Sequence, residues 1–250
     1  MMWRIASVIV FSVLLSEAHK VGARVNHVKY QNAFQDEFAE WDRTKQPNEH
    51  SVNFLTRPIG FDYDQEPQRT NNRVIQDLPL KNQTALMARY VVNQVDWAGL
   101  ATISTREDVE TFPVANLVSI SDGPIGNGTG IPYMYLTPLD FSAKDLIKDH
   151  RASLLVSLEQ GNYCKNKQLD PMDPRCPRVM ISGKIVAVKN NTAEHQIAKE
   201  LFFDRHPQLA NMPANHAFFF AKMKIFAIAL LNAFGGPKYI SVEDYFHPPV

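Results

Sequence analysis

IPYMYLTPLDFSAKDLIKDHRASLLVSL, residues 131–158, predicts a strand, a tight turn, a short helix and a second strand in succession. Thr137, Ser142 and Lys144 lie where the first strand meets the helix. A helix N-terminus offers unpaired backbone N–H groups and the positive end of the helix dipole. Two hydroxyls and an ammonium beside it would complete a cradle for a phosphate, so this stretch also offers a candidate anion site.

Ser142 has a purely structural interpretation as well. Residues 142–145, SAKD, have the pattern of a capping box, in which Ser142 is the N-cap and Asp145 reaches back to it. The sequence therefore predicts a short helix that runs to Asp149, and either role accounts for Ser142.

The composition is that of an ordinary globular protein. The 250 residues are 45% hydrophobic and 21% charged, which suits one good-sized core or two small ones. Lys plus Arg and Asp plus Glu number 26 each, and the sequence pI is about 7.1. A protein without excess positive charge is poorly suited to neutralise a run of phosphates, so direct nucleic-acid binding is disfavoured.

Residues 1–18 have the features of a secretory signal peptide. Arg4 supplies the positive start, residues 5–15 are apolar, and small residues precede a cleavage site after Ala18, with Ala23 as the alternative. A membrane anchor needs a longer apolar run, and no second such run follows. We therefore expect a soluble mature protein outside the cytosol, without a membrane span.

Residues 19–80 are polar, with scattered Pro, Asn and Gln, and have one short helical spacing, at Phe34, Phe38 and Trp41. They predict a mostly irregular N-terminal arm. Two interpretations stand for this arm: a flexible pro-like segment, or a segment that wraps the domain.

Residues 81–250 have the patterns of one compact domain. Helical spacings predict a helix that includes residues 86–95 and ends before Trp97, a second from its cap Thr192 to about Arg205, and a last turn capped by Ser241. Alternating and apolar runs predict strands at residues 97–105, 112–121, 152–160, 178–189 and 216–234, the first two as a hairpin. About six strands with interspersed short helices predict a mainly β (α+β) fold, an antiparallel barrel with helices on its rim.

The glycine-rich loop at residues 121–130, SDGPIGNGTG, is not predicted to bind a nucleotide, because no Lys-Ser/Thr pair follows it and no helix begins there. It contains one of three Asn-x-Thr glycosylation acceptors, which are Asn82, Asn127 and Asn190. All three fall in predicted loops. With a signal peptide present, we expect N-glycans on at least two of them.

The two cysteines, Cys164 and Cys176, flank a polar loop between two predicted strands. We expect a disulfide, which in the chain-entropy model would stabilise the fold by roughly 3 kcal/mol. Free thiols would suit a cytosolic protein better than a secreted one. No His is spaced near the pair to complete a zinc site, so we expect no metal.

Four segments occur in order along the chain: DWAGLATIST at 96–105, SDGPIGNGTGIPYMYLTPLD at 121–140, LFFDRHP at 201–207 and FGGPKYIS at 234–241. Together they resemble the CREG glycoprotein family, over a stretch from about Asn82 to Phe246. The resemblance implies an FMN-binding-type split β-barrel with short flanking helices, as in flavin-dependent pyridoxamine-phosphate oxidases, assembled as a homodimer.

The same resemblance implies a secreted or lysosomal glycoprotein that contributes to control of cell growth and differentiation or to lysosomal homeostasis. A glycan-dependent sorting receptor, such as the mannose-6-phosphate receptor, would then be a partner.

The oxidase relatives carry a Thr, a Ser, a Lys and an Arg-Ala pair around the flavin phosphate. The matching residues here, with one extra residue after the first, are Thr137, Ser142, Lys144 and Arg151-Ala152. The relatives' preceding strand adds an Arg and a Lys, and the matching positions here hold Asn116 and Ser121. Charge-assisted contacts are roughly twice as strong as neutral ones, so losing two cations predicts weak or no flavin binding and no cofactor.

No other pattern suggests catalysis. Motifs for a serine nucleophile, a zinc protease or a cysteine pair are absent, and His150, His195, His206 and His216 are scattered singly. We therefore expect a non-enzymatic protein without catalytic residues. The alternative is an FMN-dependent oxidoreductase that keeps a reduced phosphate site. A repressor that binds DNA directly conflicts with the signal peptide, the zero net charge and the glycosylation acceptors.

Overall fold

The structure is a computed structural model that describes residues 83–249. The predicted signal peptide, the predicted N-terminal arm and the acceptor Asn82 lie outside the described residues. Among residues 83–249, no helix is long and apolar enough to cross a membrane.

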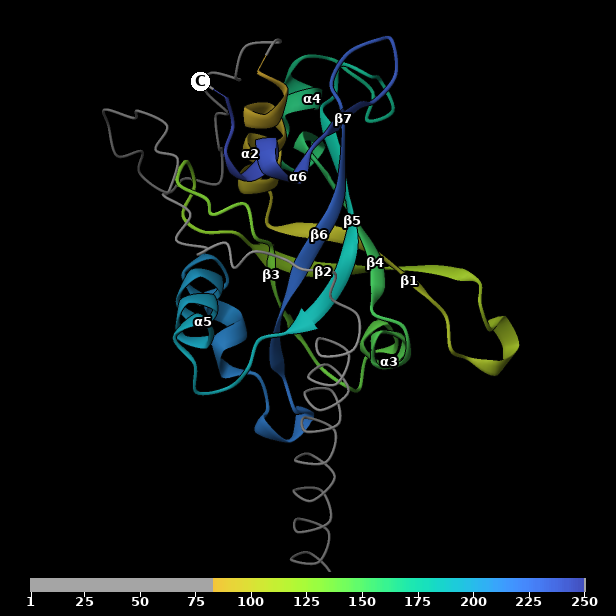
Figure 1. The fold of residues 1–250 in the computed structure, drawn as a ribbon, viewed down its shortest axis with the longest axis vertical. Helices are drawn as coiled ribbons and strands as arrows, with labels where there is room; N and C mark the ends of the chain where they lie inside the picture. The colour runs from red at the N-terminus through yellow and green to blue at the C-terminus, as the bar shows by residue number, and fades with distance from the viewer. Residues whose placement is uncertain (1–82, 250) are drawn as a thin grey trace, which may run out of the picture.

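A closed antiparallel barrel forms the centre of the structure (Figure 1). The strands are hydrogen-bonded in the order β3-β2-β1-β4-β5-β6-β7, and β3 also pairs with β6, which closes the ring and leaves β7 outside it. The strands are Trp97–Ile103 (β1), Pro113–Ser121 (β2), Tyr133–Leu136 (β3), Arg151–Ser157 (β4), Arg178–Ala187 (β5), Phe219–Leu231 (β6) and Lys238–Ile240 (β7). The six predicted strands are present and mostly shorter than predicted, although β4 begins one residue earlier, at Arg151; β7 was not predicted.

The longest strand, β6, follows from its alternating side chains. Met223 and Ile225 are buried. Lys222, which precedes Met223, and Lys224, which lies between the two buried residues, are partly exposed. Successive side chains of a strand point to opposite faces, so this alternation places one face of β6 in the core. The predicted hairpin of β1 and β2 is also present and extends beyond the barrel (Figure 1).

Short helices flank the barrel. They are α2 (Thr84–Gln94), α3 (Phe141–Lys148), α4 (Tyr163–Asn166), α5 (Ala193–Arg205) and α6 (Val242–Phe246), with 3-10 turns at Glu107–Val109, Leu158–Gly161, Pro207–Asn211 and Ala214–His216. α2 and α6 pack together at one end of the barrel, and α5 packs against β2, β3 and β6 (Figure 1). Thr192 caps α5 and Ser241 caps α6, as predicted. α4, which contains Cys164, was not predicted.

The predicted capping box at residues 142–145 is wrong. The N-cap of α3 is Asp140, whose carboxylate accepts from the Ser142 backbone N–H at 2.7 Å. Asp145 does not reach back to the cap; it is buried and accepts from the Thr102 hydroxyl and the Thr105 backbone N–H at the end of β1. These contacts fix the rotation of α3, and Asp140 is then the residue in place to cap it.

The apolar interior lies inside the barrel and beneath α2 and α6. Tyr90 of α2 and Tyr245 of α6 are among the largest fully buried side chains there. A second, smaller cluster lies beneath α5, where Phe202 packs with Phe220. These clusters hold α2, α5 and α6 against the strands and so position the loops between them.

The predicted disulfide is confirmed. The sulfurs of Cys164 and Cys176 are bonded, their Cα atoms are 5.3 Å apart, and both side chains are buried. Glu159 lies near them, and this trio is the one described group of three or more residues with closely spaced metal-ligand atoms. Because both sulfurs are used in the disulfide, the trio is not a metal site.

Candidate functional site

The junction between β3 and α3 is the candidate anion site, and its centre is a carboxylate. Asp140 accepts from the first turn of α3, through Ser142. The side-chain amide of Asn116, from β2, donates to both carboxylate oxygens of Asp140 and to the Ser142 hydroxyl, each at 3.0 Å. The helix N-terminus, which would attract a phosphate, is therefore capped by an acidic group of this chain.

The structure does not gather the three predicted phosphate residues into one cradle. Ser142 bonds with Asn116 at the junction. Thr137 instead donates its hydroxyl proton to the backbone carbonyl of His216, just before β6. Lys144 is exposed in the first turn of α3.

The two positions that hold cations in the oxidase relatives are neutral here and bonded within the chain. Asn116 holds the carboxylate of Asp140, as described above. Ser121 is buried at the end of β2, where its hydroxyl donates to the Leu201 carbonyl of α5 at 2.7 Å. Ser121 therefore fastens α5 to the barrel and lies apart from the contacts of the junction.

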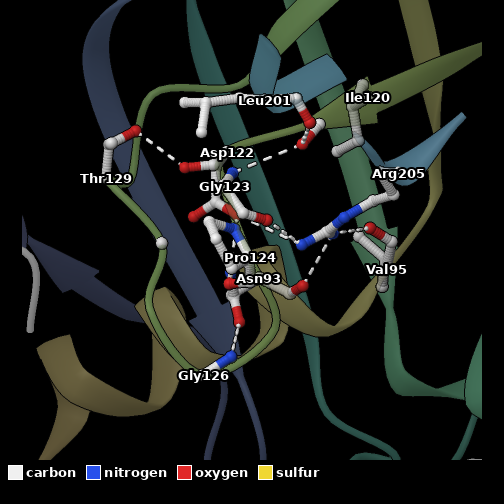
Figure 2. A network of polar contacts seen from close by, with 12 residues as sticks. Asn93, Val95, Ile120, Asp122, Gly123, Pro124, Gly126, Thr129, Leu201 and Arg205 are labelled. Atoms are coloured by element: carbon white, nitrogen blue, oxygen red, sulfur yellow. Dashed lines mark hydrogen bonds and ion pairs between the residues drawn. The ribbon is translucent and has the colours of Figure 1, made fainter. Parts of the chain in front are cut away.

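A network of buried charges lies beneath the glycine loop, which we define as residues 122–130 (Figure 2). The Asp122 carboxylate is buried and accepts from the Asn93 amide at 2.8 Å and the Gly130 backbone N–H at 3.2 Å. The Arg205 guanidinium, 4% exposed, lies 4.0 Å from it. Burial raises the pKa of Asp122, while Arg205, Asn93 and Arg89 act in the opposite direction.

The same side chains hold the backbone of the glycine loop. Arg205, the last residue of α5, donates to three backbone carbonyls, those of Asn93, Val95 and Gly123. Arg89 of α2 donates to the carbonyls of Gly128 and Tyr245. Two buried guanidinium groups from separate helices thus supply donors to the carbonyls of Gly123 and Gly128, which are buried residues of the loop.

Asn127, a predicted glycan acceptor, is exposed on the glycine loop, and Asn190 is partly exposed between β5 and α5. The loop has little freedom beneath Asn127. A Cβ added at Gly128 would lie 2.2 Å from an Asp122 carboxylate oxygen, so only glycine fits this position. The glycine loop is therefore closely packed next to Asn127.

Sequence reasoning did not predict the buried network. An Asp in a glycine-rich turn and an Arg at the end of a helix are ordinarily exposed residues with local roles. The signal available was their presence in two segments that resemble the CREG family, 121–140 and 201–207. Gly123 and Arg205 are 82 residues apart, so no local pattern marks their contact.

The single histidines do not assemble with a nucleophile. His206 is buried, and its Nε2 lies 2.8 Å from the Ile120 carbonyl. His195 packs edge-on against Phe220, and burial, together with Lys199, lowers its pKa. His216 stacks with Phe218, with ring centroids 6.3 Å apart, and His150 lies between α3 and β4.

The barrel also has an apolar outer surface, which we call the sheet face. The strand registers place Leu117, Leu155, Met180 and Tyr239 in one row across the sheet, with a glycine and an alanine between them. These four side chains are 67%, 52%, 47% and 80% exposed, respectively. A contiguous apolar row of this kind is typical of an interaction surface.

Comparison with solved structures supports the fold alone. A heme binding protein from Mycobacterium smegmatis aligns with a TM-score of 0.52 and 16% sequence identity, over 68% of this chain and 62% of that chain. The protein Atu2129 from Agrobacterium tumefaciens aligns with a TM-score of 0.51 and 16% identity, over 67% of this chain and 62% of that chain. The predicted split β-barrel is confirmed.

Comparison of sequences identifies the family. The family model described as "CREG, beta-barrel" matches residues 79–247. Protein CREG1 of Mus musculus is 44% identical over 176 residues, which cover 70% of this chain and 79% of that protein. Protein CREG2 of Homo sapiens is 38% identical over 162 residues, which cover 65% of this chain and 55% of that protein. The chain belongs to the CREG family.

Proposed function

We propose that this chain is an N-glycosylated, homodimeric protein of the secretory route, secreted or lysosomal, that catalyses no flavin reaction. Its role would be the one that the CREG resemblance implies, in control of cell growth and differentiation or in lysosomal homeostasis. One observation carries the non-enzymatic part: the Asp140 carboxylate, held by Asn116, caps the helix that would have to receive a flavin phosphate.

Electrostatics explains why the junction does not fit FMN. Two like unit charges 4 Å apart near a protein surface repel each other by about 4 kcal/mol, and a phosphate beside Asp140 would meet this repulsion. The relatives' two cations would offset it, but Asn116 and Ser121 are neutral and already bonded within the chain. The residues at this junction therefore do not fit a flavin phosphate.

An FMN titration tests this part of the proposal. The full chain, purified from secreting cells, is mixed with FMN, freed of excess dye by gel filtration and examined by visible absorbance. We expect no flavin band. A stoichiometric band would overturn the proposal and support the alternative, an FMN-dependent oxidoreductase.

A designed variant keeps a negative titration informative. The double change Asn116→Arg with Asp140→Ser removes the carboxylate and adds a cation at the position where the oxidase relatives carry one. We expect this variant to bind FMN or inorganic phosphate more tightly than the wild type. The matched control, Asp149→Ser at the other end of α3, removes the same charge and should leave phosphate binding unchanged.

The sheet face supports a second copy of this chain as the partner. Its row of exposed apolar side chains crosses neighbouring strands, and in a two-fold interface this row of one copy would pack against the same row of the other. Light scattering of the full chain should give the mass of a dimer, and Leu155→Arg should give a monomer. Ile197→Arg on α5, which is 47% exposed and lies off the sheet face, is the control and should stay dimeric.

The glycan and compartment parts rest on the predicted signal peptide and on the acceptors. Glycosidase treatment of the secreted protein should lower its mass by two or three glycans, and an unchanged mass would contradict the secretory assignment. Retention on immobilised mannose-6-phosphate receptor, released by free mannose 6-phosphate, tests the sorting receptor as a partner.

A further inference from the structure

The glycan acceptor Asn127 lies in a loop that is locked by residues far away in the chain. We infer that Asn127 accepts its oligosaccharide only before the glycine loop closes, so that the substrate of the transfer is the open chain and not the folded protein. This inference rests on the proposed function, because it requires that Asn127 be glycosylated.

The hydroxyl that defines the acceptor pattern is already used in the folded loop. An Asn-x-Ser/Thr acceptor needs the hydroxyl of its third residue, here Thr129. In the structure, this hydroxyl donates its single proton to the Asp122 carbonyl at 2.9 Å (Figure 2). It also accepts from the Ile131 backbone N–H at 3.2 Å. A transferase that reads the Thr129 hydroxyl must first break both contacts.

Gly128, the middle residue of the acceptor, is held in place like Thr129. Arg89 donates to the Gly128 carbonyl, and the Cα of Gly128 lies so close to the Asp122 carboxylate that no side chain fits. Lifting residues 127–129 into an enzyme would leave the buried Arg89 guanidinium without this acceptor. Uncovering buried charged partners is costly, so the closed loop resists the enzyme.

Closure of the loop has to wait for late parts of the chain. Arg205 follows Gly123 by 82 residues, and Tyr245, whose hydroxyl donates to the Gly130 carbonyl, follows Gly130 by 115 residues. At synthesis rates of about 5–20 residues per second, the first interval alone lasts roughly 4–16 s. The acceptor therefore stays open for seconds while the chain is being made.

Asn190 provides an internal comparison. Its acceptor hydroxyl, on Thr192, donates to the Lys189 carbonyl at 2.7 Å and accepts from the His195 backbone N–H at 3.2 Å, both three residues away. These contacts are local, at the exposed start of α5, where a helix end can fray without disturbing the core. Asn190 should therefore remain an acceptor after folding.

The transfer forms one bond and breaks one bond. A bond forms between the amide nitrogen of Asn127 and the anomeric carbon of an oligosaccharide. The bond from that carbon to the diphosphate of a lipid-linked donor breaks, and the lipid diphosphate leaves together with one amide proton.

The test compares the two acceptors in one molecule. The full chain, made without glycans and folded with its disulfide, is incubated with solubilised endoplasmic-reticulum membranes and a lipid-linked oligosaccharide. Mass spectrometry then measures occupancy at each site. We expect occupancy at Asn127 to be at least about tenfold lower than at Asn190, which corresponds to about 1.4 kcal/mol.

Further samples decide the interpretation. A peptide of residues 121–133 should be modified, which shows that the acceptor sequence is competent. Arg205→Met should raise Asn127 occupancy relative to Asn190, whether the variant opens only the loop or unfolds. Glu200→Met, exposed on the same helix, should not. If the peptide is modified and neither site of the folded chain is, the inference for Asn127 stands and the comparison with Asn190 fails.

Modification of Asn127 in the folded wild type to the same extent as in the peptide would overturn the inference. Absence of a glycan at Asn127 in the protein secreted from cells would instead contradict the proposed glycosylation at this site, so the two failures can be told apart.

Discussion

The β3–α3 junction and the glycine loop each centre on one aspartate, but they use it in opposite ways. At the junction, Asp140 is partly exposed, and its partners are a backbone N–H and the neutral amide of Asn116. In the glycine loop, Asp122 is buried beside two guanidinium groups, from Arg89 and Arg205. The region that resembles a ligand site is a self-contained cap, whereas the region that resembles an exposed turn carries the buried charges.

This contrast shows that the energetic cost of disturbing a charged residue depends on how deeply the residue is buried. A partly exposed carboxylate retains water and costs little to rearrange, whereas a buried charge that loses its partner has no substitute.

The largest expected effect is loss of the cation beneath the glycine loop. Arg205→Met removes three donors to backbone carbonyls and leaves Asp122 without its nearest cation. We expect the free energy of unfolding to fall by about 3–5 kcal/mol in denaturant titration. Arg151→Met removes an exposed ion pair with Asp149 and should lower the free energy of unfolding far less, because solvent screens surface ion pairs. Equal losses in the two variants would contradict the contrast.

A smaller loss is expected from overfilling the same loop. Gly128→Ala places a methyl group against the Asp122 carboxylate and the Asn93 amide, and we expect it to cost about 1–3 kcal/mol of unfolding free energy. Gly99→Ala is the matched control, since its nearest neighbours would lie at 3.8 Å, an ordinary contact. Thermal unfolding of both variants would test this, and an unchanged midpoint for Gly128→Ala would show that the loop can move aside.

The junction should respond as a helix cap does. Asp140→Ala removes the N-cap acceptor and should cost about 1 kcal/mol. Ser142→Ala removes only the hydroxyl that accepts from Asn116 and should cost less. Denaturant titration of the two variants therefore separates the observed cap from the predicted one; a larger loss at Ser142 would favour the capping box.

The smallest expected difference is in pH dependence. Burial raises the pKa of Asp122 in the folded state above its ordinary value of 3.8. The folded protein therefore holds the Asp122 proton more tightly than the unfolded chain does. The stability that this provides is complete below pH 3.8 and is lost as the pH rises through the pKa of folded Asp122. Unfolding measured from acid toward neutral pH should therefore show this loss in the wild type, and Asp122→Asn should flatten it.

A control at the surface has the opposite sign. Arg151 lowers the pKa of Asp149 below 3.8, so the stability from that pair is present above 3.8 and is lost as the pH falls further. Asp149→Asn should therefore leave the slope above pH 3.8 unchanged. A wild-type slope that Asp122→Asn does not alter would show that other groups set the pH dependence.

Local patterns explain which structural predictions succeeded. Thr192 and Ser241 cap helices through contacts within three residues, so the sequence contains all the information needed to identify them. Alternation identified β6 for the same reason, because the period of two is a property of the strand itself. The cap of α3 was missed because Asp140 and Ser142 are both good caps, and contacts of Asp145 with β1 decided between them.

Local patterns and ordered motifs were enough to predict six of the seven described strands, the caps of α5 and α6, the disulfide pair and the CREG family, because each depends on neighbouring residues or on motifs in a fixed order. The contacts between polar and charged residues far apart in the sequence depend on the tertiary structure. It brought Asn116 to Asp140 across 24 residues and Arg205 to Gly123 across 82 residues. Burial and hydrogen bonding give these residues their roles, and both arise only when distant parts of the chain meet.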